Sequence, residues 1–431
     1  MTVIATAVVR RRVPLAAGGC LLSFVVFWAV QRAADVSMVD LMVYRAEGDA
    51  VRAGADLYAL RATEHDLPMT YPPFAALLFT PLTLLDPADT RTLATLGNLL
   101  LLVAFVRLSL RLVGGYGHAR VETALWVSAL AVWSEPVWTT LRYGQINLLL
   151  AVLVLWDLTR RPGHRWAGVG IGVAAAIKLT PALFAVFLLV IGAVEAVRRG
   201  VWRPVVRHAC VAAAAFLGAT LVTAVVLPVD SRNFWTRVVF EAGRVGRAEN
   251  TANQSVRGVL ARLLHTAEPG AWWAAGAAVV CVAGLAVAVV AAMRGEWAWG
   301  VAACAATALL VSPVSWSHHW VWCVPMALLL WTRAVRRGGA VRWATAGGLA
   351  LAFCSYALWW VPHSHGRPEL SQNVGQMTLS AVYPVAATGF LAVAASAVLG
   401  RARSGARGKA SGPAARRHGD RAEAGQAVAN E

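Results

Sequence analysis

Long apolar runs separated by short polar stretches fill most of the 431-residue chain. Runs of about 17–25 apolar residues are long enough to cross a bilayer as helices, which satisfy their own backbone hydrogen bonds in lipid. We therefore predict an all-α polytopic membrane protein with about twelve transmembrane helices and with both termini in the cytoplasm. The predicted spans are residues 13–31, 92–113, 121–141, 145–160, 165–178, 181–198, 206–227, 271–293, 297–313, 319–335, 341–361 and 377–400.

Two stretches leave alternatives in this count. Residues 71–86 are apolar but broken by Pro72, Pro73 and Pro81, and proline removes helical hydrogen bonds. We predict a re-entrant or short helix there, because a full crossing would reverse the sidedness of every later segment. The run 13–31 resembles a signal peptide in its basic start, but it is long and no clear small-x-small cleavage site follows, so we predict a retained span.

Composition supports a membrane protein and argues against a nucleic-acid partner. The chain is 58% hydrophobic and only 14% charged, whereas soluble proteins carry about 25% charged residues. A net charge of +17 suits nucleic acid at first sight, but the cations gather in short loops and in the C-terminal tail, as the positive-inside rule predicts. The six cysteines lie in or beside apolar runs without a C-x-x-C spacing, which indicates neither a metal site nor a disulfide framework.

Arginines mark one side of the predicted bundle. With twelve spans, nearly every short basic loop falls on the same side, which the positive-inside rule places in the cytoplasm. These loops hold Arg107, Arg111 and Arg120; Arg160, Arg161 and Arg165; Arg198, Arg199, Arg203 and Arg207; and Arg333, Arg336, Arg337 and Arg342. Polar, motif-like segments gather on the opposite side, so we predict a single working face outside the cytoplasmic membrane.

The predicted transmembrane domain comprises residues 1–400, with a first outer loop at 32–70 and a long outer loop at 228–270. The remaining residues, 401–431, are rich in Arg, Gly, Ala and Ser without periodicity, which predicts a disordered basic cytoplasmic tail. A tail of this kind suits contact with anionic membrane lipids.

Asp40 opens the first outer loop, just after the first apolar run. The residues after it alternate apolar and charged positions in a helical pattern that Gly54 would close, which fits an amphipathic helix on the membrane surface. Two roles are open for Asp40. Aspartate is a favoured helix N-cap, and a carboxylate at a membrane surface is also placed to act as a general base on membrane-dissolved substrates.

Lys178 is the only lysine in the predicted membrane region, and it ends an apolar run beside Thr180. An intramembrane cation is costly and usually marks a functional pathway, so Lys178 is a candidate for neutralising a phosphate. The alternative is a lysine whose stem lies in lipid while its charge reaches the interface without a chemical role.

The segment from Ser312 to Trp320 is dense in hydrogen-bonding and aromatic side chains between two predicted spans. Adjacent histidines point in different directions on a helix, so His318 and His319 do not suggest a shared metal site. One of them is a candidate for binding phosphate or sugar hydroxyls. Interfacial tryptophans such as Trp316, together with capping residues, would explain the same composition.

Four amide side chains are candidates for sugar recognition, because an amide both donates and accepts hydrogen bonds. Gln145 and Asn147 lie at a predicted helix start on the outer face, and Asn253 and Gln254 lie in the long outer loop. All four are also ordinary loop and capping residues. Enzyme signatures such as the P-loop, G-x-S-x-G, H-E-x-x-H and D-x-D are absent from the sequence, so a metal-bound nucleotide-sugar site is not indicated.

Six short motifs occur in a fixed order: Asp40-x-x-Val43-Tyr44, YPPFAALL at 71–78, YGQINLLL at 143–150, IKLTP at 177–181, NQS at 253–255 and SPVSWSHH at 312–319. Together they resemble glycosyltransferase family 87, the actinobacterial polyprenyl-phosphate-mannose-dependent alpha-mannosyltransferases of the GT-C fold. This family includes the mycobacterial alpha-(1,2)-phosphatidylinositol-mannoside mannosyltransferases. The resemblance covers about residues 20–385.

The resemblance implies an acidic base in the first outer loop, where Asp40 is the matching position. It also implies a mannose donor on a polyprenyl phosphate, a glycolipid or lipoglycan acceptor, and no required metal or other cofactor. The residues expected to bind substrate are the phosphate candidates Lys178, His318 and His319 and the sugar candidates Tyr44, Tyr71, Gln145, Asn147, Asn253, Gln254 and Trp316.

Two other interpretations fit much of the same pattern. A lipid or sugar transporter or flippase would share the span count and the basic loops, but it predicts functional polar residues at mid-membrane and on both faces. Transfer of a different sugar, such as arabinofuranose, from a polyprenyl phosphate is not excluded by the sequence.

Overall fold

The computed structural model describes residues 2–114, 120–161, 163–200, 204–364 and 366–410, and most of them are helical. The α-helices are α1 (Thr2–Ala33), α2 (Val39–Ala53), α3 (Pro73–Phe79), α4 (Pro87–Gly114), α5 (Val121–Ala131), α6 (Glu135–Tyr143), α7 (Asn147–Leu158), α8 (Val169–Ile177), α9 (Ala182–Arg199), α10 (Pro204–Val226), α11 (Pro228–Thr236), α12 (Val256–Leu263), α13 (Gly270–Met293), α14 (Trp297–Val311), α15 (Cys323–Arg337), α16 (Ala340–Cys354), α17 (Val374–Ser380) and α18 (Val382–Ala410). The 3-10 helices are η1 (Thr80–Leu84), η3 (Val238–Phe240), η4 (Ala242–Val245), η5 (Ser317–Trp322), η6 (Ala357–Trp359) and η7 (Pro368–Ser371).

Within the described part of the chain, four helices are long and apolar enough to cross a membrane: residues 12–33 of α1, and α4, α10 and α13. Two further pairs qualify only when taken together, α6 with α7 and α17 with α18, and these are bent by 118° and 66°. The structure therefore has four candidate spans, or six if each bent pair is one span. This confirms a helical multi-span membrane protein, while the count of twelve stays a prediction.

The predicted span 121–141 is divided in the structure. Helix α5 ends at Ala131 and α6 begins at Glu135, which Pro136 follows. Proline disfavours a helical residue before it and cannot donate to the preceding turn, so the apolar run breaks there. Residues 71–86 form only α3 and η1, as the prolines in that stretch predict.

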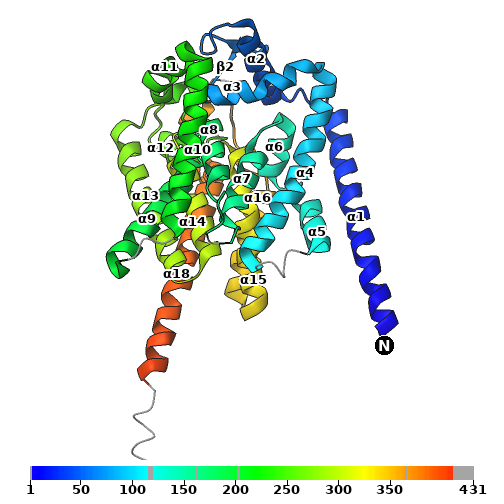
Figure 1. Ribbon diagram of the computed structural model, residues 1–431, viewed down its shortest axis with the longest axis vertical. Coiled ribbons are helices and arrows are strands. Elements are labelled where there is room, and N and C mark those ends of the chain that lie inside the picture. The colour runs from blue at the N-terminus through cyan, green and yellow to red at the C-terminus, as the bar shows by residue number, and fades with distance from the viewer. Residues whose placement is uncertain (1, 115–119, 162, 201–203, 365, 411–431) are drawn as a thin grey trace, which may run out of the picture.

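The helices run roughly along the long axis of the molecule, and α2, α3 and α11 gather at one end (Figure 1). A small antiparallel ribbon lies at the same end, where strand β1 (Arg61–Ala62) pairs with β2 (Leu67–Pro68). We call this the upper end, as in Figure 1. At the other end, α18 continues to Ala410, beyond the start of the predicted tail, and residues 411–431 lie outside the described residues.

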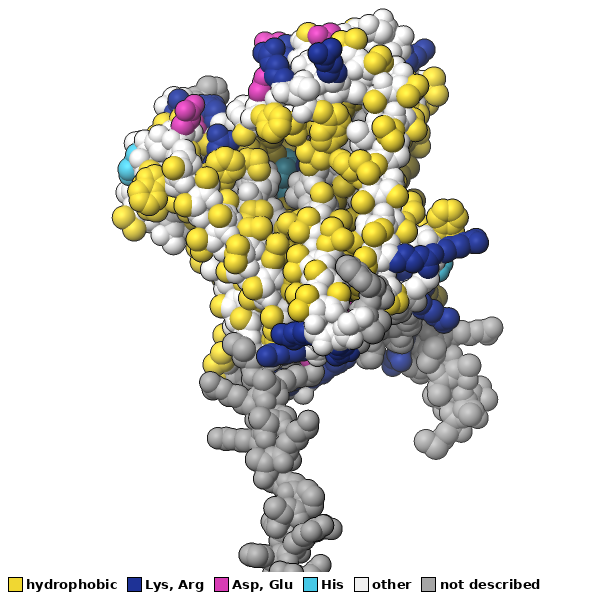
Figure 2. Space-filling model, turned by 60° about the vertical axis from the view of Figure 1, so that its left-hand side comes forward, with side chains coloured by type: hydrophobic (Ala, Val, Ile, Leu, Met, Phe, Trp, Pro, Cys, Tyr) yellow, Lys and Arg dark blue, Asp and Glu magenta, His cyan; other side chains and the backbone are white. Residues whose placement is uncertain are grey.

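Apolar side chains cover the middle of the molecule, and the acidic side chains seen in Figure 2 lie mostly at the upper end. Many large apolar residues are exposed, among them Leu100 at 73%, Leu130 at 73% and Val225 at 82%. A broad exposed apolar surface marks contact with a membrane rather than with water. The fold thus presents an apolar belt between two polar ends.

Candidate active site

A cavity of about 600 Å³ lies between α2, the α6–α7 corner, the break between α8 and α9, and the segment after α14. Figure 2 shows the surface hollowed beneath the upper end of the molecule. Most residues selected from the sequence meet in this cavity, whose lining includes Asp40, Tyr44, Tyr71, Gln145, Lys178, Trp316 and His319. The remaining candidates are placed outside this lining: Asn147, Asn253, Gln254 and His318.

Asp40 does not cap α2. The N-cap is Met38, in a left-handed conformation with φ 52°, and Asp40 lies within the first helical turn. Its Oδ2 accepts a hydrogen bond of 2.6 Å from Nε2 of Gln145. Gly54 closes the helix as a left-handed C-cap, which confirms that part of the sequence analysis. The Asp40 carboxylate therefore lines the cavity, where Gln145 orients it, and does not cap the helix.

Gln145 reaches Asp40 because the chain turns sharply between α6 and α7. Gly144 takes a left-handed φ of 68°, a conformation that glycine adopts without a Cβ penalty. A Cβ atom at that position would also lie 2.6 Å from Cβ of Leu41 on α2. Glycine thus allows both the corner and its close approach to α2.

Two tyrosines fix the orientation of the Gln145 amide. Its Oε1 accepts hydrogen bonds from the Tyr44 hydroxyl at 2.8 Å and the Tyr71 hydroxyl at 3.3 Å. The two hydroxyls also lie 2.9 Å apart, and the Tyr44 ring stacks on Phe79 at 4.4 Å between centroids. Because the amide oxygen meets donors, the amide nitrogen is left to donate to Asp40.

Burial raises the pKa of Asp40 to about 6, although the hydrogen bond from Gln145 and the charge of Lys178 act in the opposite direction. Glu47 follows Asp40 by seven residues, on the same face of α2. Burial and the nearby charge of Asp40 raise the pKa of Glu47 to about 8. At neutral pH, Asp40 is therefore the charged member of this pair and Glu47 keeps its proton.

Glu47 is a site residue that sequence reasoning missed. It is fully buried beside the cavity, and neither carboxyl oxygen has a hydrogen-bond partner among the described residues. Its signal was the helical spacing of Asp40, Tyr44 and Glu47, which places all three side chains on one face. Arg244 was also missed: it lines the cavity and donates to the backbone carbonyls of Met69 and Tyr58.

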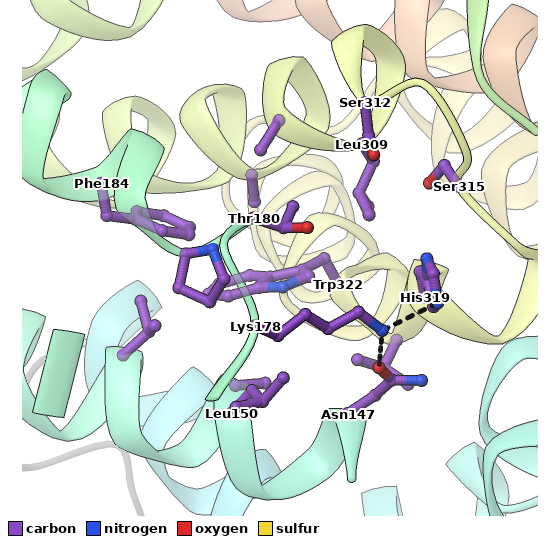
Figure 3. A pocket seen from close by; sticks show the side chains of 16 residues that line it. Asn147, Leu150, Lys178, Thr180, Phe184, Leu309, Ser312, Ser315, His319 and Trp322 are labelled. Carbon is purple, nitrogen blue, oxygen red and sulfur yellow. Dashed lines mark hydrogen bonds between the residues drawn. The ribbon is translucent and has the colours of Figure 1, made fainter. Parts of the chain in front are cut away.

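Lys178 follows α8 in an extended conformation, before Pro181 starts the turn into α9. Its ammonium group donates to Oδ1 of Asn147 at 3.3 Å and to the Tyr71 hydroxyl at 3.5 Å. It also lies 2.9 Å from Nε2 of His319, and Figure 3 shows it between His319 and Asn147. The break between the helices thus presents a cation to polar partners inside the fold.

The two adjacent histidines have different surroundings. His319 lines the cavity and faces Lys178. The His318 ring is buried against Tyr143 at 5.5 Å between centroids, and its backbone carbonyl accepts hydrogen bonds from Thr140 and Asn147. The structure brings only His319 into the cavity, whereas His318 packs behind it.

Asn253 and Gln254 are fully buried, and their amides bind other parts of the protein. Oδ1 of Asn253 accepts from the Ser315 backbone at 3.0 Å, and the Gln254 backbone donates to the Ser315 carbonyl at 2.7 Å. Nε2 of Gln254 donates to the carbonyl of Ser380. Trp316 pairs with Asn253 and itself lines the cavity. The Asn253 amide and the Gln254 backbone thus hold the segment that carries Trp316 and His319, while the Gln254 amide binds α17.

Glu135 is a third residue that sequence reasoning missed, although an acid within a predicted span is a signal in itself. The side chain is fully buried. Its Oε1 accepts from Ser317 at 2.8 Å and from Trp359 at 3.0 Å, and its Oε2 accepts from the Tyr383 hydroxyl at 2.7 Å. Glu135 therefore ties η5, which carries both histidines, to α6 and to the C-terminal helices.

We expect Glu135→Ala to lower the free energy of unfolding by about 3 kcal/mol or more, because several buried donors lose a charged acceptor at once. Thermal unfolding of the purified protein in detergent, followed by tryptophan fluorescence, measures this change. Glu64→Ala is a suitable control, since the Glu64 side chain is 84% exposed. Equal melting temperatures for the two variants would contradict the structural role of Glu135.

A sequence model of the family described as Glycosyltransferase family 87 matches residues 69–313. The chain is 35% identical over 312 residues to the polyprenol-phosphate-mannose-dependent alpha-(1-2)-phosphatidylinositol pentamannoside mannosyltransferase of Mycobacterium tuberculosis (strain CDC 1551 / Oshkosh), covering 70% of this chain and 68% of that protein. It is 33% identical over 342 residues to the polyprenol-phosphate-mannose-dependent alpha-(1-2)-phosphatidylinositol mannoside mannosyltransferase of Mycolicibacterium smegmatis (strain ATCC 700084), covering 73% of this chain and 74% of that protein.

Among solved structures, the chain is similar to ArnT from Cupriavidus metallidurans bound to undecaprenyl phosphate. The TM-score is 0.38 at 18% sequence identity, covering 89% of this chain and 79% of that chain.

Proposed function

The chain belongs to glycosyltransferase family 87, and on this premise we propose that it transfers mannose from a polyprenyl-monophosphate donor to a hydroxyl of a glycolipid or lipoglycan. The acceptor is of the phosphatidylinositol mannoside or lipomannan type, and the new linkage is alpha-(1,2), in line with the relatives' names. The observation that carries the proposal is the meeting of the Asp40 carboxylate with Lys178 and His319 in one cavity.

The catalytic step we propose is a single displacement. The acceptor hydroxyl oxygen forms a bond to C1 of the mannose while the bond from C1 to the phosphate oxygen breaks. The hydroxyl proton passes to Asp40, and the bonding electron pair leaves with the polyprenyl phosphate. A single displacement inverts C1, so a beta-linked donor gives an alpha-linked product.

Lys178 and His319 are placed to stabilise the departing phosphate. A fixed cation where negative charge develops favours the transition state, especially in a site sheltered from water. Asn147 and His319 both contact the Lys178 ammonium (Figure 3). Tyr44, Tyr71 and Trp316 complete a polar and aromatic wall that suits a sugar ring.

Activity should depend on the charge state of Asp40. A general base works only when deprotonated, and the pKa of Asp40 is raised to about 6. We expect kcat/KM to be half-maximal near pH 6 on its acid side and to fall about tenfold per pH unit below that. In Gln145→Met the acid limb should move to higher pH, because the lost hydrogen bond favours the charged carboxylate.

The measurement is a pH–rate profile of both proteins, with size-exclusion chromatography at each pH to confirm that the fold is retained. If the acid limb of Gln145→Met lies at the same pH as that of the wild type while the fold is retained, Asp40 is not the group whose titration limits activity.

The decisive test of the proposed function is transfer by the purified protein from defined donors. We expect labelled mannose from polyprenyl-phosphate mannose to appear on a phosphatidylinositol mannoside acceptor, and no transfer from polyprenyl-phosphate arabinofuranose. Transfer of arabinofuranose would change the sugar within the same chemistry. Movement of intact lipid-linked sugar across vesicles, without transfer, would favour a flippase instead.

We further propose a GT-C-type fold with about twelve spans, with the cavity opening to the outer face of the cytoplasmic membrane. The distribution of basic loops supports this orientation. In a cysteine-free background, a label that cannot cross the membrane should reach a cysteine at Arg237, in the long outer loop, and not one at Gly163. Both positions are exposed in the structure. Labelling at Gly163 alone would reverse the orientation.

A further inference from the structure

A second cavity, of about 370 Å³, lies at the lower end of the molecule, away from the candidate active site. It is formed by the end of α4, the end of α7 with the residues that follow it, and the start of α10. Helix α7 connects the two regions: Asn147 at its start contacts Lys178, and Asp157 near its end lines the second cavity. None of the residues assigned to sugar transfer lines this second cavity.

The lining of the second cavity is strongly cationic. Its charged and titratable residues are Arg111, Arg160, Arg161 and Arg207, the histidines His164 and His208, and a single acid, Asp157. Arg160, Arg161 and Arg207 form no salt bridge with any residue that the structure describes. Like charges around one hollow repel each other, so an anion placed among them would be stabilised.

The one acid is already committed. Asp157 is 1% exposed, and its Oδ2 accepts a hydrogen bond of 2.8 Å from the backbone of Ile171 in the first turn of α8. A carboxylate at a helix N-terminus is favoured by the unpaired backbone donors there. Asp157 therefore serves α8 and forms no salt bridge with Arg160, Arg161 or Arg207 among the described residues, although the charge of Arg160 still acts on it.

The guanidinium groups of Arg160 and Arg207 are oriented by contacts with neighbouring residues. The Arg160 guanidinium stacks on Trp156 at 3.4 Å from the ring centroid and lies 2.8 Å from Nδ1 of His164. Arg207 donates to the carbonyl of Gly163 at 3.3 Å. Each contact uses only part of a guanidinium, which has five N–H donors suited to the paired oxygens of a phosphate.

The surroundings indicate a membrane interface at this cavity. Trp156 and Trp166 are 43% and 54% exposed beside it, and exposed tryptophans concentrate at the level of the lipid headgroups. Basic pockets between membrane helices at that depth bind phosphate-bearing headgroups. We propose that the second cavity is a second ligand site of this protein, which binds the phosphate group of an anionic lipid from the adjoining leaflet.

The test uses the full chain, purified in detergent, and phosphatidylglycerol as the lipid probe. Lipid binding is measured by native mass spectrometry for the wild-type protein and for Arg160→Gln/Arg207→Gln. We expect the double variant to bind phosphatidylglycerol about a hundredfold more weakly, since each charged hydrogen bond from a cavity guanidinium to the phosphate contributes about a tenfold gain in affinity. Phosphatidylcholine, which has no net charge, should bind both proteins weakly and equally.

Arg165→Gln is the matched control, because Arg165 lies in the same loop and is exposed without lining the cavity. It should bind phosphatidylglycerol as the wild type does. If the double variant does not fold, Arg161→Gln replaces it, since Arg161 lines the cavity and is exposed. Unchanged binding by the cavity variants, or an equal loss in Arg165→Gln, would overturn the proposal.

A parallel titration with inorganic phosphate separates the two sources of a phosphate group. Protection against thermal unfolding by millimolar phosphate, lost in the cavity variant and absent with phosphatidylglycerol, would assign the site to a free phosphate and remove the lipid. Protection by phosphatidylglycerol alone supports the lipid. Neither result depends on sugar transfer, so this site and the proposed function stand or fall separately.

Discussion

Replacing Asp40 with asparagine is expected to lower the rate of sugar transfer by about 10²–10⁴, the usual contribution of a positioned general base. Asparagine keeps the shape of the side chain and can still bond to Gln145, which lies 2.6 Å away. It cannot accept the proton of an acceptor hydroxyl. The measurement is initial transfer of labelled mannose from polyprenyl-phosphate mannose in membranes, normalised to the amount of protein.

Asp49→Asn is the matched control for Asp40. Asp49 lies on the same helix, but its side chain is 49% exposed and pairs with Arg45 on the surface. An exposed ion pair of this kind contributes about 0–1 kcal/mol, so the control should keep near wild-type activity and stability. An Asp40→Asn protein that expresses normally and keeps more than about a tenth of wild-type transfer would remove Asp40 from the role of base.

The positions of most helices could be predicted from the sequence because the length of an apolar run is a local property. The runs at 92–113, 206–227 and 271–293 correspond closely to α4, α10 and α13. The interruptions were harder. Pro136 divides the run 121–141, and the 118° corner between α6 and α7 depends on Gly144 meeting α2. Such a corner is set by tertiary contact, which hydrophobic periodicity does not record.

The candidate site was predictable in its residue types but not in its pairings. Asp40 and Gln145 are 105 positions apart, and Lys178 and His319 are 141 apart. No spacing rule joins residues that far apart in the sequence. The candidate residues were therefore selected from the order of the six motifs along the chain. The structure supplies what the order lacked: Gln145 orients Asp40, and Lys178 faces His319.

Selecting residues by their side-chain chemistry alone also picked amides that stabilise the fold. An amide suits a sugar hydroxyl and a backbone carbonyl equally well. The Asn253 amide binds the backbone of the segment that carries Trp316, and the Gln254 amide binds the carbonyl of Ser380. The sequence offers no way to separate these uses from substrate binding. Glu47 shows the converse, because its burial without a partner is visible only once α2 is packed.

Lys178→Met is expected to reduce kcat by about 10²–10³ while leaving the melting temperature unchanged or slightly higher. The loss of activity follows from removing the cation that faces the departing phosphate. The retained stability follows because methionine fills similar space without the desolvation cost of a buried charge, which offsets the hydrogen bonds that Asn147 and His319 lose. The measurements are transfer at saturating donor and thermal unfolding of the same preparation.

The controls distinguish this role from a structural or interfacial one. Arg142→Met removes an exposed cation near the same corner, outside the lining of the cavity, and should leave kcat intact. Because the charge acts mainly as the phosphate leaves, KM for the donor should change much less than kcat in Lys178→Met. Full activity in Lys178→Met would return Lys178 to the role of an interfacial lysine. A collapse in stability would instead make the contacts with Asn147 and His319 structural. The phosphate would then need another cation, and among the described residues Arg244 also lines the cavity.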